Sequence, residues 1–269
     1  MRGFALGLCG LLMLVGCSDD GHESQGATDT GGRPNGSGGR SSSGGDGDPT
    51  TTSDHRYGDV YTGQYHLGPV DFAESDWHNA CAPAGGYRDS LQEATGLGGE
   101  YLAGVSTEHA DGGGVCDACI EITAETGRTI VARVVTYGVT NEPGDLDVSP
   151  SVYEELNTGE YPRSMSWQFA ACPDVGPLAY EFQTEANVWW TSLWVRNPRV
   201  PLDTVDVRSA NHANFIELTR GSDGTLTDAG GFGEGEFTLR LTAMDGQVIT
   251  ETFPGFDPGE LVVSSQQFE

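Results

Sequence analysis

Short segments in which apolar and polar residues alternate recur along most of the chain, and long helical patterns do not. Residues 120–124, 130–136 and 165–169 show this pattern. Because side chains of a strand point alternately to opposite faces, each segment is typical of a strand with one buried face. Ser149 and Pro150 can begin one short helix, with Val152 on its inner side. The pattern predicts an all-β fold of many short strands.

The first 17 residues have the pattern of an export signal. Arg2 precedes an apolar stretch that is shorter than the roughly 20 residues of a spanning helix. The stretch ends in Leu14-Val15-Gly16-Cys17, which resembles the lipobox of bacterial lipoproteins. By this resemblance, residues 1–17 are a signal peptide and Cys17 is the lipidated residue. We therefore expect an exported protein that is lipid-anchored at the cell surface or outer membrane, or extracellular.

The composition indicates a flexible linker near the N-terminus and a strongly acidic chain. Residues 18–57 are mostly Gly, Ser, Thr and Asp, so we expect a disordered linker there. The net charge of −27 argues against nucleic acid, whose phosphates are bound by several Lys or Arg. It equally disfavours acidic polymers. Membrane contact is expected only through the lipid anchor.

Four cysteines remain after Cys9 in the signal and Cys17 at the lipid site. They are Cys81, Cys116, Cys119 and Cys172. Four cysteines allow three pairings, and an exported chain meets oxidising conditions. Cys116 and Cys119 have the spacing of half a zinc site, but no second such pair follows. The histidines His66, His78 and His109 show no metal spacing either, so we expect structural disulfides, no metal and no cofactor.

Four short motifs around these cysteines carry a family resemblance. They are Cys116-Asp117-Ala118-Cys119-Ile120-Glu121-Ile122, Arg133-Val134-Val135-Thr136, Leu146-Asp147-Val148-Ser149-Pro150 and Trp167-Gln168-Phe169-Ala170-Ala171-Cys172-Pro173. Their order and spacing resemble the first domain of expansins. This resemblance implies a six-stranded double-psi β-barrel over residues 58–175, similar to family 45 endoglucanases. It also implies the disulfide pairs Cys81–Cys116 and Cys119–Cys172.

Asp147 is the candidate contact residue of the expected barrel. By the resemblance it occupies the position of the general acid of the endoglucanases. Inverting hydrolysis needs a second carboxylate roughly 6.5–9.5 Å away, and expansins lack it. Residues 64–66 offer no carboxylate, while Asp71 and Asp76 stay open as substitutes. We expect Asp147 to contact a glycan without catalysis; the alternative is an Asp favoured by a nearby helix N-terminus.

Tyr137 is a departure from the expansin pattern. It follows Val135-Thr136 where the family carries an acidic residue. Its ring could stack on a sugar, or it could be an ordinary packed or exposed Tyr. The sequence leaves open whether loosening activity survives this replacement.

The second half of the chain predicts a separate β-sandwich. Strand patterns fall at residues 178–182, 189–195, 204–207, 214–218, 237–243 and 248–253. Asp245-Gly246 between the last two is a hairpin signal. We therefore expect an immunoglobulin-like β-sandwich over residues 176–269.

Three tryptophans lie within the segment 187–197. This segment resembles the Trp-Trp-x-x-x-x-Val-Arg-Asn segment of bacterial expansin second domains, which are family 63 carbohydrate-binding modules. The resemblance implies that Trp189 and Trp190 form a platform that stacks on glucan. The family's third platform aromatic is missing near 222–224. We expect Trp194, on the same strand face as Trp190, to extend the platform; the alternative is that these Trp anchor the core.

The two resemblances together predict an exported, monomeric, expansin-like protein. It would bind cellulose, xyloglucan or another β-glucan and loosen wall contacts without hydrolysis. Two alternatives stay open. One is a glycan-cleaving enzyme on the same barrel, either an endoglucanase or a peptidoglycan lytic transglycosylase, although no Asn-Asp-Arg-Gly-Pro-like motif is present. The other is a purely carbohydrate-binding lipoprotein.

Overall fold

The computed structural model describes residues 55–269 except 74–78, 100, 110–112, 139–141 and 174. Residues 51–269 belong to one compact unit. The expectations for the signal peptide, Cys17, most of the linker, Asp76 and His78 lie outside the described residues. Among the residues described, no helix is long and apolar enough to cross a membrane.

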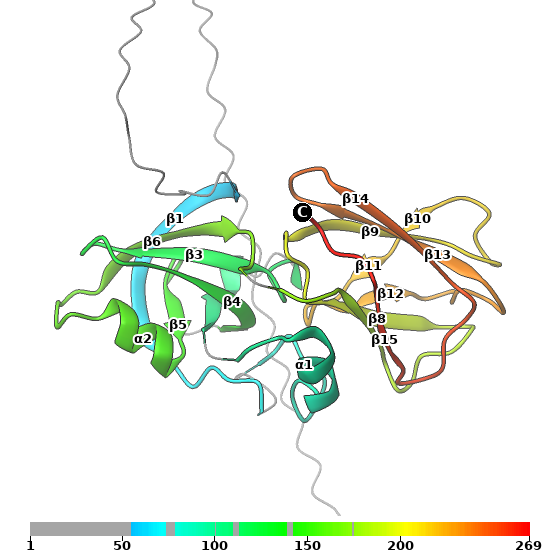
Figure 1. Cartoon of the computed structure of the whole chain (residues 1–269), viewed down its shortest axis with the longest axis horizontal. Helices are drawn as coiled ribbons and strands as arrows, with labels where there is room; N and C mark the ends of the chain where they lie inside the picture. The colour runs from blue at the N-terminus through cyan, green and yellow to red at the C-terminus, as the bar shows by residue number, and fades with distance from the viewer. Residues whose placement is uncertain (1–54, 74–78, 100, 110–112, 139–141, 174) are drawn as a thin grey trace, which may run out of the picture. The chain divides into compact units, whose positions relative to one another are not determined.

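The first six strands close into a barrel, as expected (Figure 1). The strands are β1 (Arg56–Leu67), β2 (Leu102–Ser106), β3 (Cys119–Ala124), β4 (Thr129–Gly138), β5 (Leu146–Val148) and β6 (Ser164–Ala170). Their order around the barrel is β1-β5-β2-β4-β3-β6. The pairs β1–β5 and β2–β4 are parallel, and the other pairs are antiparallel. Trp167 and Ile120 are fully buried inside, and α2 (Pro150–Leu156) turns Val152 and Leu156 inward.

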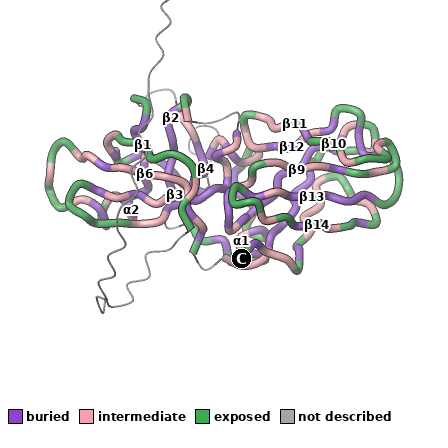
Figure 2. The backbone as a smooth tube through the Cα atoms, turned by 90° about the horizontal axis from the view of Figure 1, so that it is seen from above, coloured by how far each residue is buried: buried purple, intermediate pink, exposed green. Residues whose placement is uncertain are grey.

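The remaining strands form a β-sandwich, which was also expected. One sheet has the order β10-β9-β13-β14, and the other has the order β11-β12-β8-β7-β15. The strands are β7 (Ala179–Phe182), β8 (Thr191–Arg196), β9 (Leu202–Arg208), β10 (Ile216–Glu217), β11 (Thr219–Arg220), β12 (Leu226–Asp228), β13 (Phe237–Ala243), β14 (Val248–Phe253) and β15 (Leu261–Val263). Figure 2 shows the buried stretches running along these strands.

Individual strand limits differ from the expectation in a few places. The strand expected at 189–195 begins only at Thr191, so Trp189 and Trp190 precede it. In the sandwich, strands β11, β12 and β15 were not expected, because two or three residues are too few to show alternation. The Asp245-Gly246 turn joins β13 to β14 as expected, with Thr242 opposite Val248.

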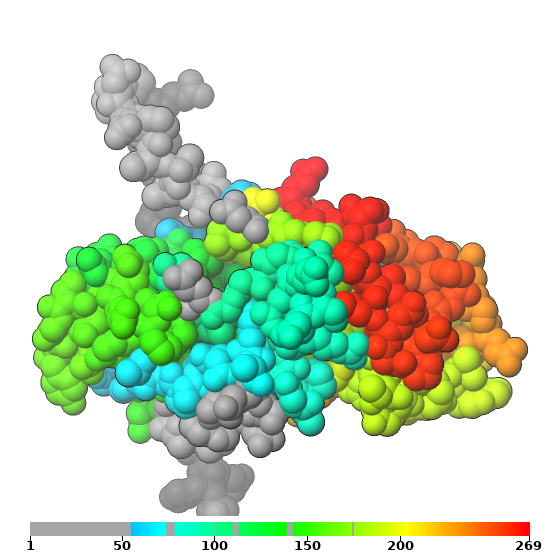
Figure 3. Space-filling model, turned by 60° about the horizontal axis from the view of Figure 1, so that its bottom comes forward, coloured from blue at the N-terminus to red at the C-terminus, as the bar shows by residue number. Residues whose placement is uncertain are grey.

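Helix α1 (Asp89–Thr95) packs between the barrel and the sandwich. Its Leu91 is fully buried in an apolar cluster with Leu102 and Val135 of the barrel. The sandwich contributes Ala179 to this cluster, and Leu261 packs against it. Figure 3 shows the segment of α1 against the C-terminal part of the sandwich surface.

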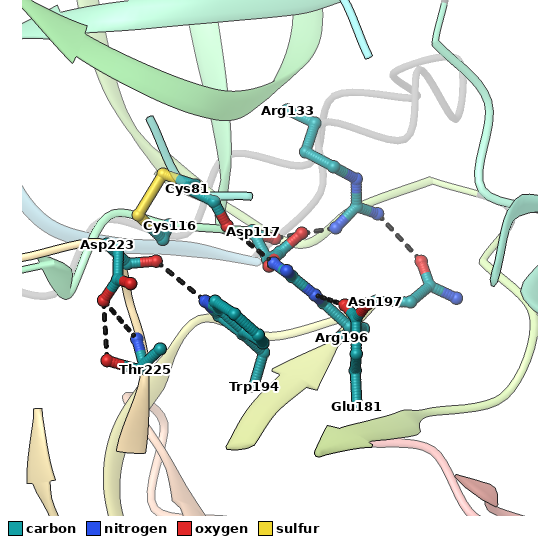
Figure 4. A network of polar contacts seen from close by, with 10 residues as sticks. All are labelled: Cys81, Cys116, Asp117, Arg133, Glu181, Trp194, Arg196, Asn197, Asp223 and Thr225. Carbon is teal, nitrogen blue, oxygen red and sulfur yellow. Dashed lines mark hydrogen bonds and ion pairs between the residues drawn. A yellow bond between two sulfur atoms is a disulfide. The ribbon is translucent and has the colours of Figure 1, made fainter. Parts of the chain in front are cut away.

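A buried arginine links the two parts by charge (Figure 4). Arg196 of β8 is 0% exposed. Its Nη1 donates to Asp117 Oδ2 at 2.6 Å and to the carbonyl of Cys81 at 2.8 Å, both on the barrel side. Its Nε donates to Glu181 Oε2 of β7 at 2.8 Å. The guanidinium therefore neutralises one carboxylate from the barrel and one from the sandwich.

A second buried arginine, Arg133, belongs to the same network. Arg133 of β4 donates to the carbonyl of Asp117 at 2.7 Å and to Asn197 Oδ1 at 2.9 Å. Burial lowers the pKa of Arg133. Burial also tends to lower the pKa of Arg196. The anionic neighbours of Arg196, Asp117 foremost, have the larger combined effect, so the pKa of Arg196 is raised. Both guanidinium groups stay charged inside the protein.

Removing the Arg196 charge is expected to destabilise the protein strongly. In Arg196→Leu, Asp117 and Glu181 would be left buried without this cation, which costs about 3–5 kcal/mol in comparable sites. Urea unfolding measures the change. Arg240→Leu is the matched control, because the Arg240–Asp206 pair is partly exposed and such pairs contribute about 0–1 kcal/mol. Equal losses in the two variants would contradict the role assigned to Arg196.

Candidate functional site

Four residues form a row across neighbouring barrel strands. Asp147 of β5 lies in register with His66 of β1 and with Gly104 of β2. Gly104 is in turn paired with Thr136 of β4. Side chains in register on adjacent strands lie on the same face of a sheet. We call these four residues the Asp147 row.

The Asp147 row faces away from the barrel core. Leu146 and Val148, the two neighbours of Asp147 in β5, are fully buried in that core, whereas Asp147 is half-buried. Since successive side chains of a strand alternate, Asp147 points outward. The carboxylate is thus placed where a ligand outside the barrel can reach it.

Two glycines lie beside Asp147 at positions where a side chain would not fit. A Cβ on Gly68 would lie 2.7 Å from Asp147 Cβ, closer than such atoms approach. A Cβ on Gly104 would lie 2.7 Å from Thr136 Cγ2 and 3.8 Å from Asp147 Cβ. Only glycine therefore fits at these two positions, because a side chain would collide with Asp147 or Thr136.

A second carboxylate, Asp145, lies two residues before Asp147 and was not singled out from the sequence. Its Oδ1 accepts a hydrogen bond from the Gln64 backbone at 2.7 Å, and its Oδ2 contacts His66 Nε2 at 3.1 Å. Asp145 therefore holds β1 and orients the imidazole of His66. The signal for it was the Asp-Leu-Asp alternation, which places two carboxylates on one side of an extended segment.

The other expected barrel residues occupy different surroundings. Asp71 Oδ1 accepts a hydrogen bond from the backbone of Ala73 at 3.0 Å, which closes a local turn. Tyr137 is half-buried, lies opposite Val105 and packs against the barrel core. Its neighbour Thr136 belongs to the Asp147 row, so Tyr137 points to the other face. This arrangement favours a packing role, and its contact with sugar stays a prediction.

Both expected disulfides are present. Cys81 is bonded to Cys116, and Cys119 is bonded to Cys172. The first bond lies against the sandwich, because a Cβ on Gly224 would meet Cys116 Cβ at 2.6 Å. In the described part of the chain, no group of three or more His, Cys, Asp or Glu residues could hold a metal.

On the sandwich, a tight turn over residues 187–190 presents an exposed indole. Asn187 and Trp190 exchange backbone hydrogen bonds, with the Asn187 N–H donating at 2.8 Å and the Trp190 N–H at 3.2 Å. Asn187 Oδ1 also accepts from the backbone of Trp189 at 3.0 Å. Trp189 is 72% exposed, and Trp190 is partly exposed. We call residues 187–190 the Trp189 turn.

The Trp189 turn rests on a neighbouring loop. Gly233 donates its backbone N–H to the carbonyl of Val188 at 2.9 Å. Gly231, at φ +70°, touches the turn so closely that a Cβ would lie 2.3 Å from the Val188 oxygen. Asp228 fixes this loop by accepting from Gly230 and by contacting His212 at 2.6 Å. The exposed indole is therefore carried by a well-supported backbone.

The prediction that Trp194 extends a solvent-facing platform is wrong. Leu193 and Val195 lie in the sandwich core, so Trp194 is on the outer strand face, as the alternation indicated. That face is covered, however, and Trp194 is only 4% exposed. Its Nε1 donates to the carbonyl of Asp223 at 3.0 Å, and its ring lies 4.8 Å from the Arg196 guanidinium carbon. Trp194 packs beside the buried Arg196 guanidinium instead.

Comparison with known proteins relates this architecture to one group. No protein-family model matches the chain. The chain is 22% identical over 214 residues to Expansin-like protein 6 of Dictyostelium discoideum, which covers 74% of this chain and 72% of the relative. It is 22% identical over 190 residues to Expansin-like protein 3 of the same organism, covering 67% of this chain and 55% of that relative.

Solved structures give the same answer for the fold. An expansin of Clavibacter michiganensis superposes with a TM-score of 0.64 at 18% identity, covering 78% of this chain and 98% of the expansin. The chain is expansin-like in sequence and fold. A single-residue mutant of the Clavibacter expansin, in complex with cellohexaose, matches this expansin-like chain with a TM-score of 0.61 at 18% identity and the same coverage.

The different surroundings of two tryptophans predict effects of different size on the free energy of unfolding. Trp194→Ala should lower the free energy of unfolding by about 3–5 kcal/mol, the usual loss for a large buried aromatic side chain. Trp189→Ala should change it by less than about 0.5 kcal/mol, because the ring is mostly in solvent. Urea unfolding of the two variants beside the wild type measures both values. A large loss for Trp189→Ala would show that this ring is part of the core packing.

Proposed function

We propose that this expansin-like chain binds cellulose or a related β-glucan and loosens wall polysaccharide contacts without hydrolysis. The observation that carries the proposal is the Trp189 turn, which exposes an indole on a rigid support in a chain of expansin fold. The binding of cellohexaose by a mutant of the structurally similar Clavibacter expansin supports the same ligand class.

The physical chemistry of the exposed rings favours a neutral glucan. The faces of β-linked glucose carry axial hydrogens and are apolar, so a flat indole can cover them, while the hydroxyl groups at the ring edge stay in water. The net charge of −27 repels acidic wall polymers and leaves neutral chains as the better ligands. Asp147 on the barrel supplies a hydrogen-bond acceptor for sugar hydroxyl groups.

The contacts of the barrel carboxylates favour binding without cleavage. Inverting hydrolysis requires a second carboxylate that activates a water molecule. Asp145 uses both of its oxygens on Gln64 and His66. We therefore assign Asp147 to contact with the glycan. Cleavage on the same barrel remains the rival proposal, and the assay below separates the two.

We also propose that the chain is exported and held by a lipid at Cys17. The run Leu14-Val15-Gly16 before this Cys supports lipidation. The two disulfides of the barrel are consistent with an oxidising compartment outside the cytoplasm.

Removing the two exposed rings is expected to weaken cellulose binding. Stacked aromatic rings contribute about 1 kcal/mol each, so Trp189→Ala/Trp190→Ala should lower the affinity about tenfold or more. Depletion of the protein from solution by microcrystalline cellulose measures this affinity, and reducing ends are assayed in the same supernatant. Wild-type protein should release no reducing ends.

Val248→Ala is the matched control for this experiment. Val248 is 55% exposed and lies on β14 in the other sheet, so its loss should leave binding unchanged. Unchanged binding in the double Trp variant would remove the Trp189 turn from the proposed function. Reducing ends that accumulate with time would make the protein a glycan-cleaving enzyme.

Asp147→Asn is expected to separate loosening from binding. The change keeps the size of the side chain but removes its charge, and the Trp189 turn is untouched. Cellulose depletion should therefore stay near the wild-type value, whereas the mechanical weakening of cellulose paper under constant load should be lost. Full weakening by this variant would show that the Asp147 carboxylate is not needed.

A further inference from the structure

A cleft between the barrel and the sandwich is not used by the proposed function. Its volume is about 790 Å³, within the range of small-molecule sites. Its barrel wall is the segment 82–86 together with Arg88. Its sandwich wall comprises Gln183, Thr184, Glu185, Trp194, Asp223, Pro258 and Gly259. The cleft is large enough for at least one sugar ring.

The walls of the cleft are fixed to one another. Arg88 Nε forms an ion pair with Glu181 Oε1 at 2.6 Å, and its Nη1 donates to the carbonyl of Gly259 at 2.8 Å. Gly259 in turn donates its backbone N–H to the carbonyl of Gln183 at 3.0 Å. One arginine of the barrel side thus holds two segments of the sandwich wall. A preformed cleft of this kind loses little entropy when a ligand enters.

The lining has the mixture of groups that sugars need. Ala82, Pro83 and Ala84 are small and apolar, and Gly85 and Gly86 carry no side chain. The polar groups on the other wall include an amide, a hydroxyl and two carboxylates, from Gln183, Thr184, Glu185 and Asp223. Apolar surface with a few hydrogen-bonding groups is typical of small-molecule sites.

The charges of the lining select against acidic sugars. The guanidinium of Arg88 is neutralised by Glu181. Glu185 and Asp223 add two negative charges to the lining. A uronic acid would therefore be repelled, and a neutral sugar is the better occupant.

A hydrogen bond connects each side of the cleft to a segment that carries one of the two glucan contacts of the proposed function. On the barrel side, the backbone N–H of Ala80, two residues before the wall segment 82–86, donates to Thr136 Oγ1 of the Asp147 row at 3.1 Å. On the sandwich side, Asn187 Nδ2 donates to the carbonyl of Glu185 at 3.0 Å, which connects the other wall to the Trp189 turn. The cleft is therefore a candidate site for a group carried by a polymer that contacts both Asp147 and Trp189.

We propose that the cleft binds a neutral sugar branch of a β-glucan whose backbone contacts Asp147 and the Trp189 turn. A backbone that stacks flat on Trp189 stays at the surface, and only a substituent projecting from it can enter a cleft. This inference rests on the proposed function. It makes branched neutral glucans the preferred ligands.

The test compares a branched with an unbranched soluble glucan. Calorimetric titration of the full chain with xyloglucan and with unbranched mixed-linkage β-glucan gives the two affinities. The wild type should bind xyloglucan at least about fivefold more tightly. Ala84→Trp should remove this preference and leave the affinity for the unbranched glucan unchanged, because the exposed Ala84 lines the cleft and a large ring there fills it.

Two further variants test whether the loss of preference comes from filling the cleft and not from adding a ring to the surface. Thr184→Trp fills the cleft from the sandwich wall and should act like Ala84→Trp. Thr126→Trp places the same ring on an exposed turn between β3 and β4 outside the cleft and should keep the preference. Equal loss for both glucans in the cleft variants would overturn the inference.

The outcomes for the wild type separate the inference from the proposed function. Binding of both glucans with equal affinity overturns the branch site and leaves the proposed function standing. Binding of neither glucan, together with no depletion by cellulose, overturns both. A preference for xyloglucan that the two cleft variants retain places the branch elsewhere and also overturns the inference.

Discussion

The arrangement of the protein depends on the buried charge of Arg196. This guanidinium lies between a carboxylate of the barrel, Asp117, and one of the sandwich, Glu181, and none of the three side chains is more than 3% exposed. Charges in such surroundings are stable only when they are paired, because each has lost its water. The two parts must therefore meet in one geometry for the ion pairs to form.

The same contact explains why the aromatic platform differs from the expectation. The loop that should carry a third platform ring instead offers the Asp223 carbonyl to Trp194. Trp194 lies over the Arg196 guanidinium, and the Tyr87 ring lies 4.7 Å from the carbon of the same group. The Trp194 ring therefore contributes to the charge cluster and not to a solvent-facing surface. Exposed stacking is left to the Trp189 turn, which is held by its own loop.

Much of the fold could be predicted, because the alternation of apolar and polar residues along a strand is a local property of the sequence. The alternation of residues 120–124 and 165–169 predicted strands that became β3 and β6, and the disulfide pairing implied by the expansin resemblance is present. The failures concern contacts between distant segments. Alternation put Trp194 on the correct strand face but does not say whether solvent or another part of the chain covers it. Asp145 was missed because its partners lie on β1, about 80 residues away.

The charge cluster also limits how such a chain can change during evolution. Asp117 and Arg196 belong to different halves of the sequence but stabilise each other at 2.6 Å. Replacing one half with that of a relative lacking the matching charge would leave a buried ion unpaired. The halves must therefore diverge together at these positions, while an exposed residue outside the cluster, such as Trp189, can change without leaving a buried ion unpaired.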